Sequence, residues 1–408
     1  MKKCRACGTE LVTEIINLKK SPPSNAYLPL EERNSPEVFY PLIIMLCETC
    51  YLVQTVDFTP AEELFTKNYA YLSSTSTTWL SHSQKFVDHV VDIEKLDEKS
   101  FVVELASNDG YLLQFFENKK IPNLGIEPTE STAAIAKKNG INVIQDFFSF
   151  LLSEQISSTH GKADLIIANN VYAHVPDIID FTNGIYNILA SEGVVSIEFP
   201  HVLNLIKKNQ FDTIYHEHFS YLSLTAVQYI FERCDLKIIN VEEIDTHGGS
   251  LRVWGTKNDS LRKPLKSVAK MLQIECVSGI KDREFYTELK ISADKIKIDL
   301  LSFLVEAKKK GEVTVGYGAA AKGNTLLNFS GIDNDLISLI FDNSFQKQGK
   351  VAPGNGIPIH PLSDCNQYEI DNVIILPWNI AEELKASFDS KYFKPVNYYV
   401  AVPELKLI

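Results

Sequence analysis

Short apolar runs alternate with helix-like segments from Phe101 onward, and this alternation limits the possible folds more than any other feature. Each run is rich in β-branched residues and ends in polar or acidic residues: FVVEL, NLGIEP, NVIQDFF, DLIIANN and VVSIEFP. Runs of this kind, separated by about 20 to 30 residues, are typical of a parallel sheet covered by helices. Ligands bind such sheets at the carboxyl ends of the strands. The pattern therefore predicts an α/β domain with a polar site along one edge.

Further apolar runs extend the pattern towards the carboxyl terminus. LKIINVEEI and GGSLRVWGT are predicted to complete the first sheet. A charged, helix-favouring stretch over residues 282–310 then leads into EVTVGYGAAAKGNTLLNF, which has the form of a second strand–loop–helix unit. LISLIFDN and NVIILPW follow as strands. We therefore expect a first α/β domain over residues 69–256 and a second, smaller α/β domain over residues 257–408.

The length and charge of the chain restrict its partners. With 408 residues it is long enough for two or three domains. A formal net charge of -12 argues against a surface built for nucleic acid or anionic lipid. No apolar run reaches the roughly 18 to 20 residues of a membrane helix, and the start, MKKCRACGTE, has no apolar signal core. We expect a cytoplasmic protein that binds neither nucleic acid nor membranes.

Four of the seven cysteines form two Cys-x-x-Cys pairs, Cys4 with Cys7 and Cys47 with Cys50. In a reducing compartment, two such pairs supply the four thiolates that a tetrahedral zinc ion prefers. Four cysteines leave no coordination position open, so this zinc is expected to stabilise the fold rather than to catalyse. A redox-active pair is the alternative. The pattern predicts a small zinc-binding domain over residues 1–68.

The loop after the first predicted strand, ELASNDG, is suited to a nucleoside. Its small residues let the backbone approach a ligand, and Gly110 can adopt an unusual dihedral at the helix entrance. The loop has no Lys or Arg to grip a phosphate, which favours a nucleoside without phosphates, and S-adenosylmethionine fits because its cationic sulfonium suits an acidic cleft. The predicted contacts in this loop are Glu104, Ala106, Asn108, Asp109 and Gly110.

Polar residues also end the next three strands. Glu127, followed by Pro128, is placed to accept hydrogen bonds from ribose hydroxyls. Acidic residues at strand ends are also common caps of the following helix, and the serial order on consecutive strands is what favours the ligand interpretation. The predicted contacts beyond the first loop are Glu127, Pro128, Asp146, Phe147, Asn169 and Asn170, with Tyr71 from the polar and aromatic run before the first strand.

The stretch YHEHF, residues 215–219, concentrates titratable side chains and allows three interpretations. His216 and His218 are two residues apart, which places them on one side of a strand, whereas metal ligands on a helix are usually three or four apart. A structural role, in which polar side chains fix a loop, is the second interpretation. The third is acid/base chemistry, because histidine can be neutral at pH 7 and still accept a proton.

A second glycine loop, residues 316–321, follows a predicted strand and fits G-x-G-x-x-G/A, with Asp342 at the end of the next strand. Such a fingerprint indicates a dinucleotide site, although glycine loops also serve tight packing alone. A helix amino terminus beside a lysine is a natural pyrophosphate cradle. The predicted phosphate contacts are Gly318, Lys322, Asn324 and Lys347, with Arg252 as a further candidate unless it is an ordinary exposed strand arginine.

Taken together, these motifs resemble the sugar C-methyltransferases of deoxysugar biosynthesis, which methylate a ring carbon of nucleotide-linked keto-deoxysugars with S-adenosylmethionine. The resemblance spans nearly all of the chain and one position departs from it, since Ala106 stands where many methyltransferases have glycine. The motifs that carry it are the two cysteine pairs, SNAYL, ELASNDG, YHEHFSYLS, GGSLRVW and GYGAAAKGNTLLN. It implies a small zinc-binding domain, a class I (Rossmann-like) methyltransferase domain and a smaller α/β domain that helps to hold the nucleotide.

The resemblance also implies roles within YHEHF. Methylation of carbon requires removal of a proton next to a ketone and stabilisation of the enolate oxygen. The family assigns the base to the second histidine of the motif, here His218, with Tyr215 polarising the keto oxygen and Glu217 orienting its neighbours or binding substrate. His174 is a candidate second acid/base group, or a capping or packing histidine. The expected substrate is a dTDP-linked 4-keto-deoxysugar methylated at C3, and the expected protein is a monomer.

Two other functions remain open at this point. The second glycine loop is compatible with an NAD-dependent nucleotide-sugar oxidoreductase, although no Tyr-x-x-x-Lys pair lies near it. A non-catalytic zinc-domain adaptor that keeps a degenerate methyltransferase fold is the third hypothesis, and the intact Tyr215, His218 and strand-end carboxylates speak against it. The roles of His216 and of His201, which follows the fifth strand, stay open.

Overall fold

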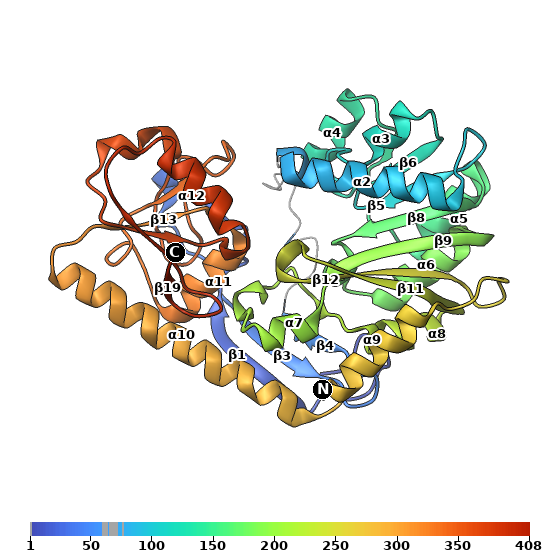
Figure 1. Cartoon of the computed structure of the whole chain (residues 1–408), viewed down its shortest axis with the longest axis horizontal. Coiled ribbons are helices and arrows are strands. Elements are labelled where there is room, and N and C mark those ends of the chain that lie inside the picture. Colours follow the sequence, from blue (N-terminus) through green and yellow to red (C-terminus); the bar gives the residue numbers. More distant parts are fainter. Residues whose placement is uncertain (1, 59–63, 65–71, 76) are drawn as a thin grey trace.

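The protein has two lobes that are joined along one side by an amino-terminal sheet and a long helix (Figure 1). The computed structural model describes residues 2–58, 64, 72–75 and 77–408. Tyr71, one of the predicted cofactor contacts, lies outside the described residues. No helix in the described parts of the chain is long and apolar enough to cross a membrane.

The larger lobe contains a seven-stranded sheet in the order β11-β12-β9-β8-β5-β6-β7. Its parallel strands are β5 (Val102–Leu105), β6 (Asn123–Ile126), β7 (Val143–Ile144), β8 (Ala163–Asn169) and β9 (Leu189–Pro200). The antiparallel pair β11 (Leu236–Ile244) and β12 (Ser250–Lys257) completes the sheet on the β9 side. The strand order reverses at β5, which places a ligand crevice at the carboxyl ends of β5 and its neighbours. The predicted parallel α/β sheet is therefore confirmed.

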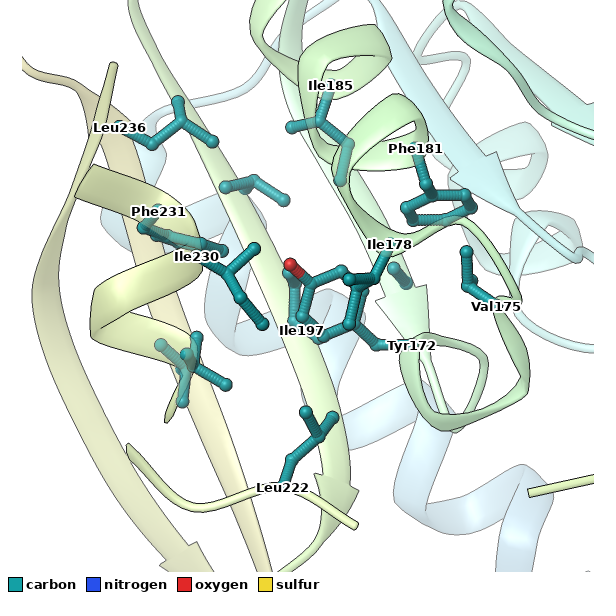
Figure 2. Packing of buried hydrophobic residues seen from close by; sticks show 14 of the residues in the cluster. Tyr172, Val175, Ile178, Phe181, Ile185, Ile197, Leu222, Ile230, Phe231 and Leu236 are labelled. Carbon is teal, nitrogen blue, oxygen red and sulfur yellow. The ribbon is translucent and has the colours of Figure 1, made fainter. Parts of the chain in front are cut away.

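Helices cover both faces of this sheet and form two cores. One core contains residues of α2 (Thr77–Glu94), α3 (Leu113–Asn118) and α4 (Glu130–Lys138). The other contains residues of α5 (Phe150–His160), α6 (Ile178–Ile188) and α8 (Leu224–Arg233). Figure 2 shows Ile178 and Phe181 of α6 and Ile230 of α8 gathered around Ile197 of β9 and Tyr172. Successive residues of β5 point to opposite cores, because side chains alternate along a strand.

Side-chain caps begin three of these helices. Oγ of Ser149 accepts a hydrogen bond from Leu152 N–H before α5, and Oγ of Ser223 accepts one from Ala226 N–H before α8. Asp177 caps α6 in the same way. Each cap satisfies an amide that the first turn leaves unpaired. The short helix α7 (Val202–Lys207) follows β9 directly and leads towards the YHEHF segment.

The smaller lobe is a second α/β unit, as predicted. Its six-stranded sheet has the order β16-β14-β13-β17-β18-β19. The strands are β13 (Thr314–Tyr317), β14 (Ile340–Asp342), β16 (Ile359–Pro361), β17 (Asn372–Ile375), β18 (Asn397–Val400) and β19 (Lys406–Leu407). The helices α11 (Ala321–Ser330) and α12 (Ala381–Asp389) belong to this unit, and α9 (Lys266–Val277) and α10 (Arg283–Lys309) lead into it. The predicted helix over residues 282–310 is therefore confirmed as α10.

The amino-terminal sheet joins the two lobes. It has the order β1-β3-β4-β10, with β1 (Thr13–Ser21), β3 (Tyr40–Leu46) and β4 (Val53–Thr55) from the amino-terminal domain and β10 (Ser220–Tyr221) from the segment after YHEHF. A separate two-stranded pairing links β2 (Leu28–Pro29) with β15 (Lys350–Val351) of the smaller lobe. Apolar residues of β1 and β3 share a core with α10 and α11. The amino-terminal domain therefore lies between the two α/β units and contacts both of them.

Candidate active site

A cavity of about 390 Å³ lies at the carboxyl ends of the central strands. Its lining comes from the segments that follow β5, β6, β8 and β9, from the loop before β10, and from the start of α11 in the smaller lobe. Asn25 of the amino-terminal domain also lines it. All three parts of the chain therefore meet at one cavity.

The loop after β5 forms one wall through an unusual backbone. Ala106, Asn108 and Gly110 adopt left-handed conformations, with φ values of 55°, 50° and 81°. A side chain is sterically excluded at Gly110, where a Cβ would lie 2.7 Å from Cγ1 of Ile141. Ala106 and Asn108 line the cavity and Gly110 does not. Gly110 therefore allows the tight turn, whereas Ala106 and Asn108 line the cavity where a ligand can contact them.

The buried carboxylate of Glu127 follows β6 and holds this loop in place. One oxygen accepts the backbone N–H of Asn108 at 2.9 Å, and the other accepts the backbone N–H of Thr129 at 2.9 Å. A carboxylate has further lone pairs beyond these two bonds. Glu127 and Pro128 both line the cavity. Glu127 can therefore accept hydrogen bonds from a ligand hydroxyl while its geometry is fixed by the backbone.

The end of β8 presents polar atoms that lack partners. Oδ1 of Asn169 and both polar side-chain atoms of Asn170 are buried without a hydrogen-bond partner among the described residues. An unpaired buried polar atom costs roughly 1 to 3 kcal/mol, so these atoms indicate a place where a ligand completes the bonding. Both residues line the cavity beside Phe147, whose side chain is 41% exposed. This edge fits the nucleoside of S-adenosylmethionine.

Three of the other predicted cofactor residues, Glu104, Asp109 and Asp146, lie outside the cavity lining. Glu104 is buried within β5, and this burial raises the pKa of its carboxyl well above the ordinary value. Asp109 accepts the backbone N–H of Ser74 at 3.2 Å, so it fixes the chain that precedes α2. Asp146 is exposed and accepts the backbone N–H of the following residue at 2.8 Å.

The YHEHF segment places Tyr215 and His218 in direct contact. Nδ1 of His218 lies 2.8 Å from the carbonyl oxygen of Thr213, and a carbonyl can only accept, so Nδ1 carries the proton. Nε2 therefore has a free electron pair, and it accepts the phenol O–H of Tyr215 at 2.8 Å. Burial, with a smaller effect from nearby His174, lowers the pKa of His218 well below its ordinary value. The imidazole is thus neutral at pH 7.

His174 lies against this pair from a different element. It ends η3 (Tyr172–His174), which follows β8, and its Nδ1 donates to the carbonyl oxygen of Glu217 at 2.8 Å. Its ring centroid is 4.6 Å from that of His218. Burial lowers the pKa of His174 to about 4. The cavity thus holds two neutral imidazoles side by side, and the structure brings His174, Tyr215, Glu217 and His218 together in its lining.

Glu217 is the most buried residue of the segment that lines the cavity, at 1% exposure. Nδ2 of Asn25 donates to both carboxylate oxygens, at 2.9 and 2.7 Å. Burial raises the pKa of Glu217 to about 7, and the Asn25 bond opposes this change. Asn25 belongs to the SNAYL segment, so it was visible in the sequence, but nothing there indicated which carboxylate it contacts.

The other two histidines in question lie outside the cavity lining. Nε2 of His216 is 3.3 Å from the carbonyl oxygen of Tyr40, so this side chain ties YHEHF to β3. Nε2 of His201 is 2.7 Å from Glu275, a buried carboxylate that also accepts the backbone N–H of Leu224 at 2.6 Å. Both histidines therefore connect structural elements and do not face the candidate site.

The four predicted metal ligands are brought together at the other end of the amino-terminal domain. The sulfur atoms of Cys4, Cys7, Cys47 and Cys50 all lie within 4.8 Å of one another. Nε2 of Gln54 donates a hydrogen bond to Sγ of Cys4 at 3.2 Å. Hydrogen bonds of this kind orient the ligands of a metal site. Within the described part of the chain, this is the only cluster suited to a metal, so YHEHF is not a metal site there. The donor set fits zinc.

The smaller lobe contributes two lysines to the cavity lining, Lys322 at the start of α11 and Lys347 from the loop after β14. Nζ of Lys322 donates to Oδ1 of Asn379 at 2.6 Å and lies 4.6 Å above the ring of Trp378. Burial lowers the pKa of Lys322, and the nearby carboxylate of Asp212 opposes this. Nζ of Lys347 donates to the carbonyl oxygen of Ala319 at 2.8 Å. This wall is therefore cationic.

Gly318, Asn324 and Arg252 were predicted to contact phosphates, and none of them lines the cavity. Gly318 has φ 83°, and a Cβ there would lie 2.6 Å from Pro377. Nδ2 of Asn324 donates to the carbonyl oxygen of Ser24 at 2.8 Å. These two residues therefore shape the loop and hold the amino-terminal segment rather than a ligand.

Arg252 departs furthest from prediction. The side chain is buried in β12 rather than exposed, and its guanidinium donates to Glu198 at 3.0 Å and to Glu242 at 3.4 Å. It also lies 4.6 Å above the ring of Phe86 in α2. The donors that a phosphate needs are thus occupied by two carboxylates, because burial of an arginine requires paired charge. Arg252 joins the sheet to α2.

Five aromatic residues of the lining were not predicted, namely Trp79, Tyr111, Phe148, Phe181 and His247. His247 has φ 52° and its ring centroid is 5.6 Å from that of Trp79. Burial lowers the pKa of His247 to about 4. Its position next to two glycines in THGGS was the available signal, since a sharp turn can aim a side chain into a site.

Comparison with known proteins places the chain in context. Family models match residues 4–65 (a domain described as zinc binding), residues 80–241 (methyltransferase domain) and residues 245–403 (C-methyltransferase C-terminal domain). The chain is 30% identical over 406 residues to the C-methyltransferase NovU of Streptomyces niveus, covering 100% of this chain and 96% of that protein.

Two solved structures with partial similarity are methyltransferases that depend on S-adenosylmethionine. The protein from Anabaena variabilis has a TM-score of 0.39 and 14% identity, covering 49% of this chain and 96% of that one. The protein from Clostridium acetobutylicum has a TM-score of 0.36 and 10% identity, covering 44% of this chain and 92% of that one.

Proposed function

We propose that this chain, which belongs to the C-methyltransferase family and depends on S-adenosylmethionine, methylates a ring carbon of a nucleotide-linked 4-keto-deoxysugar. The observation that carries the proposal is the 2.8 Å hydrogen bond between Tyr215 and Nε2 of His218, inside the cavity that holds the candidate nucleoside edge. A neutral imidazole beside a phenol suits the two tasks of carbon methylation, which are proton removal and stabilisation of an oxyanion.

S-adenosylmethionine, when bound, supplies an electrophilic methyl group. Glu127 is placed to accept hydrogen bonds from its ribose, because the backbone bonds of Asn108 and Thr129 hold the carboxylate in a fixed geometry. The unpaired amide atoms of Asn169 and Asn170 supply further donors and acceptors. The residues assigned to the cofactor are Ala106, Asn108, Glu127, Pro128, Phe147, Asn169 and Asn170.

His218 acts as the base in this proposal. Its Nε2 takes the proton from the carbon next to the ketone, and the electron pair of that C–H bond moves to the keto oxygen as an enolate. Tyr215 turns its O–H from His218 to the keto oxygen, which frees Nε2 and stabilises the negative charge. The nucleophilic carbon formed in this way would accept the methyl group that bound S-adenosylmethionine would supply, with the sulfonium as the group that leaves. His174, 4.6 Å away by ring centroids, is the second acid/base group.

The cationic wall is assigned to the nucleotide. Lys322 and Lys347 lie in the same lining as the base, and a diphosphate is the anion that a helix amino terminus with Lys322 and a second lysine beside it is suited to bind. Glu217 is assigned to the sugar hydroxyls. We propose a dTDP-linked sugar with methylation at C3, which is one of the two carbons, C3 and C5, that a C4 ketone makes acidic enough for a histidine.

We also propose that zinc has a structural role. Four thiolates complete a tetrahedral shell and leave no position for a substrate. Cys4, Cys47 and Cys50 belong to the same core as Leu105 and Ile197 of the central sheet. Loss of the metal is therefore expected to weaken the packing of the amino-terminal domain against this sheet. Zinc chelation should lower the melting temperature, and added zinc should restore it.

The proposed function is tested by mass spectrometry of a library of nucleotide-linked keto-sugars incubated with the enzyme and methyl-labelled cofactor. A product that gains one labelled methyl group on a ring carbon supports the proposal. Proton exchange gives a separate readout: in D₂O with S-adenosylhomocysteine, the enzyme should exchange the C3 proton of the substrate for deuterium. No methylation of any keto-sugar in the library would contradict the substrate class.

His218→Asn is the decisive variant for the mechanism. Loss of a general base lowers turnover by about 10²- to 10⁴-fold, and it should also abolish the deuterium exchange. Cofactor affinity should stay at the wild-type value, because His218 does not belong to the nucleoside edge. His89→Asn on the exposed side of α2 is the matched control and should leave all three quantities unchanged. Wild-type turnover of His218→Asn would remove this residue as the base.

The two alternative functions receive no support beyond the sequence patterns. The full-length relative carries the name of a C-methyltransferase, and the second glycine loop belongs to a domain named for C-methyltransferases, which disfavours an NAD-dependent oxidoreductase. The non-catalytic adaptor is disfavoured by the close contacts among Tyr215, His218 and His174. The expected monomer stays a prediction.

A further inference from the structure

The SNAYL segment, residues 24–28, is held between the two lobes by side-chain contacts on both sides. On the side of the smaller lobe, Nδ2 of Asn324 donates to the carbonyl oxygen of Ser24 at 2.8 Å, and the phenol of Tyr27 donates to the carbonyl oxygen of Ala319 at 2.7 Å. The next two residues pair as β2 with β15. The segment is therefore fixed to the same loop that supplies Lys322.

On its other side, the segment reaches the YHEHF motif through one residue. Nδ2 of Asn25 lies 2.9 and 2.7 Å from the two carboxylate oxygens of Glu217, and Asn25 and Glu217 both line the cavity. An amide N–H is a donor only, and an ionised carboxylate is an acceptor only, so this pairing is matched to the ionised form of Glu217. It also joins a side chain of the amino-terminal domain directly to a candidate catalytic carboxylate.

We propose that Asn25 is a positioning residue through which the amino-terminal zinc-binding domain sets the orientation and charge of Glu217. The amino-terminal domain thereby completes the active site, in addition to stabilising the protein. This inference rests on the proposed function for the role of Glu217 in turnover, but the contact itself and the ionisation of Glu217 can be measured without any substrate.

The electrostatic surroundings of Glu217 give the expected direction of change. Burial raises the pKa of Glu217 to about 7, and the Asn25 bond lowers it. The other titratable groups that face it are the phenol of Tyr27, the imidazole of His174, which donates to the Glu217 carbonyl, and the imidazole of His218 in the same loop. None of these is charged at pH 7, since burial lowers the pKa of both histidines, which keeps the imidazoles neutral, and raises that of Tyr27, which keeps the phenol protonated. Asn25 is thus the group that favours the carboxylate.

Asn25→Asp is the sharpest test, because it keeps the shape of the side chain, removes the N–H donors and places a second carboxyl group beside Glu217. Two carboxyl groups at hydrogen-bond distance cannot both ionise easily, so the upper apparent pKa of the pair should rise by about one unit or more. In the methyl-transfer assay, the limb of the pH profile that disappears in Glu217→Gln should move to higher pH in Asn25→Asp. Cofactor affinity should stay unchanged. Asn34→Asp, an exposed change in the same domain, is the control and should not move this limb.

A measurement without substrate separates this inference from the proposed function. In protein labelled with ¹³C at the glutamate carboxyl carbons, the Glu217 signal is the one missing from Glu217→Gln. Its titration midpoint should rise in Asn25→Asp and stay in place in Asn34→Asp. If the midpoint moves while no keto-sugar is methylated, the positioning contact holds and the proposed substrate is wrong. An unmoved midpoint would overturn the inference, whatever the activity.

A double variant covers the case in which Asn25→Asp folds poorly. Asn25→Asp with Glu217→Gln exchanges the amide and the carboxylate between the two positions, so the hydrogen bond can form again in reversed order. The melting temperature should recover relative to Asn25→Asp alone, while methyl transfer should not recover, because the carboxylate then lies on the amino-terminal segment. Full recovery of methyl transfer by the exchanged pair would show that the position of the carboxylate is unimportant, and this would contradict the inference.

Discussion

Two strand–loop–helix units line the cavity, one after β5 in the larger lobe and one after β13 in the smaller lobe, and they differ mainly in charge. The wall around the first unit carries the carboxylate of Glu127 after β6 and the amides of Asn169 and Asn170 at the end of β8, the two strands beside β5. The wall around the second unit carries Lys322 at the start of α11 and Lys347 from the loop after β14. In the proposed function, the first wall binds a cationic sulfonium and the second wall binds an anionic diphosphate. On that proposal, side-chain charge rather than loop shape assigns each wall its ligand.

The two loops also differ in their need for glycine. Gly318 has φ 83° and Pro377 leaves no room for a Cβ, so the second loop cannot take another residue without a shift. Ala106 has φ 55° in the first loop and carries a methyl group, so this turn accommodates a Cβ. The departure of Ala106 from the glycine of many methyltransferases is therefore compatible with the same turn.

Among the variants of the two walls, Glu127→Gln should have the largest effect, which is a loss of cofactor affinity. The amide keeps the size of the side chain but loses one acceptor, so either a backbone N–H or a cofactor hydroxyl is left without a partner. Hydrogen bonds to charged groups contribute about 1.5 to 3 kcal/mol, which corresponds to a loss of about 10- to 100-fold in cofactor affinity. Calorimetric titration with S-adenosylmethionine measures this directly.

The KM of the sugar nucleotide should change little in Glu127→Gln, since residue 127 lies on the wall opposite the two lysines. Glu154→Gln on the exposed side of α5 is the matched control and should bind cofactor normally. A variant that loses affinity for the sugar nucleotide but not for the cofactor would reverse the assignment of the two walls.

Lys322→Met should produce the second-largest effect, on the opposite wall. Loss of a charge-assisted bond to phosphate is expected to raise the KM of the sugar nucleotide by about tenfold. Cofactor affinity should stay unchanged. Lys295→Met on the exposed side of α10 provides the control. If cofactor affinity falls as strongly as substrate affinity, the two walls do not act separately.

The sequence was sufficient for the fold and for one half of the site, and the reason is the range of the interactions involved. Strand alternation, the helix α10 and the residues after strands depend on local patterns, so Glu127, Asn169 and Asn170 could be placed in advance. Asn25 and Arg252 depend on packing between distant segments. Local pattern cannot show that Arg252 pairs with Glu198 in the core, or that Asn25 reaches Glu217 across 192 positions of the chain.

Lys322→Met should also move the pH dependence of proton removal. Burial lowers the pKa of His218 first, and the positive charge of Lys322 adds a smaller effect in the same direction, because a nearby cation disfavours the imidazolium. Without that charge the pKa of His218 rises, so the increase in turnover with pH should occur at a higher pH than in the wild type. The pH profile of kcat measures the change. An unchanged profile would mean that Lys322 and His218 lie too far apart to interact, and a shift to lower pH would contradict the predicted sign.

Ionic strength should change the KM of the sugar nucleotide more than the cofactor affinity, and this is the smallest of the predicted effects. The lysines act on a polyanion partly through long-range attraction, and raising the ionic strength from about 0.01 to 0.15 M shortens the screening length from about 30 to 8 Å. The KM of the sugar nucleotide should therefore rise severalfold over this range. Cofactor affinity should change less, because Glu127 is buried and acts through short hydrogen bonds. In Lys322→Met the salt dependence of the KM should weaken, since one of the charges that salt screens is gone. In the wild type, an equal response of the KM and of the cofactor affinity to salt would mean that the two walls do not differ in charge.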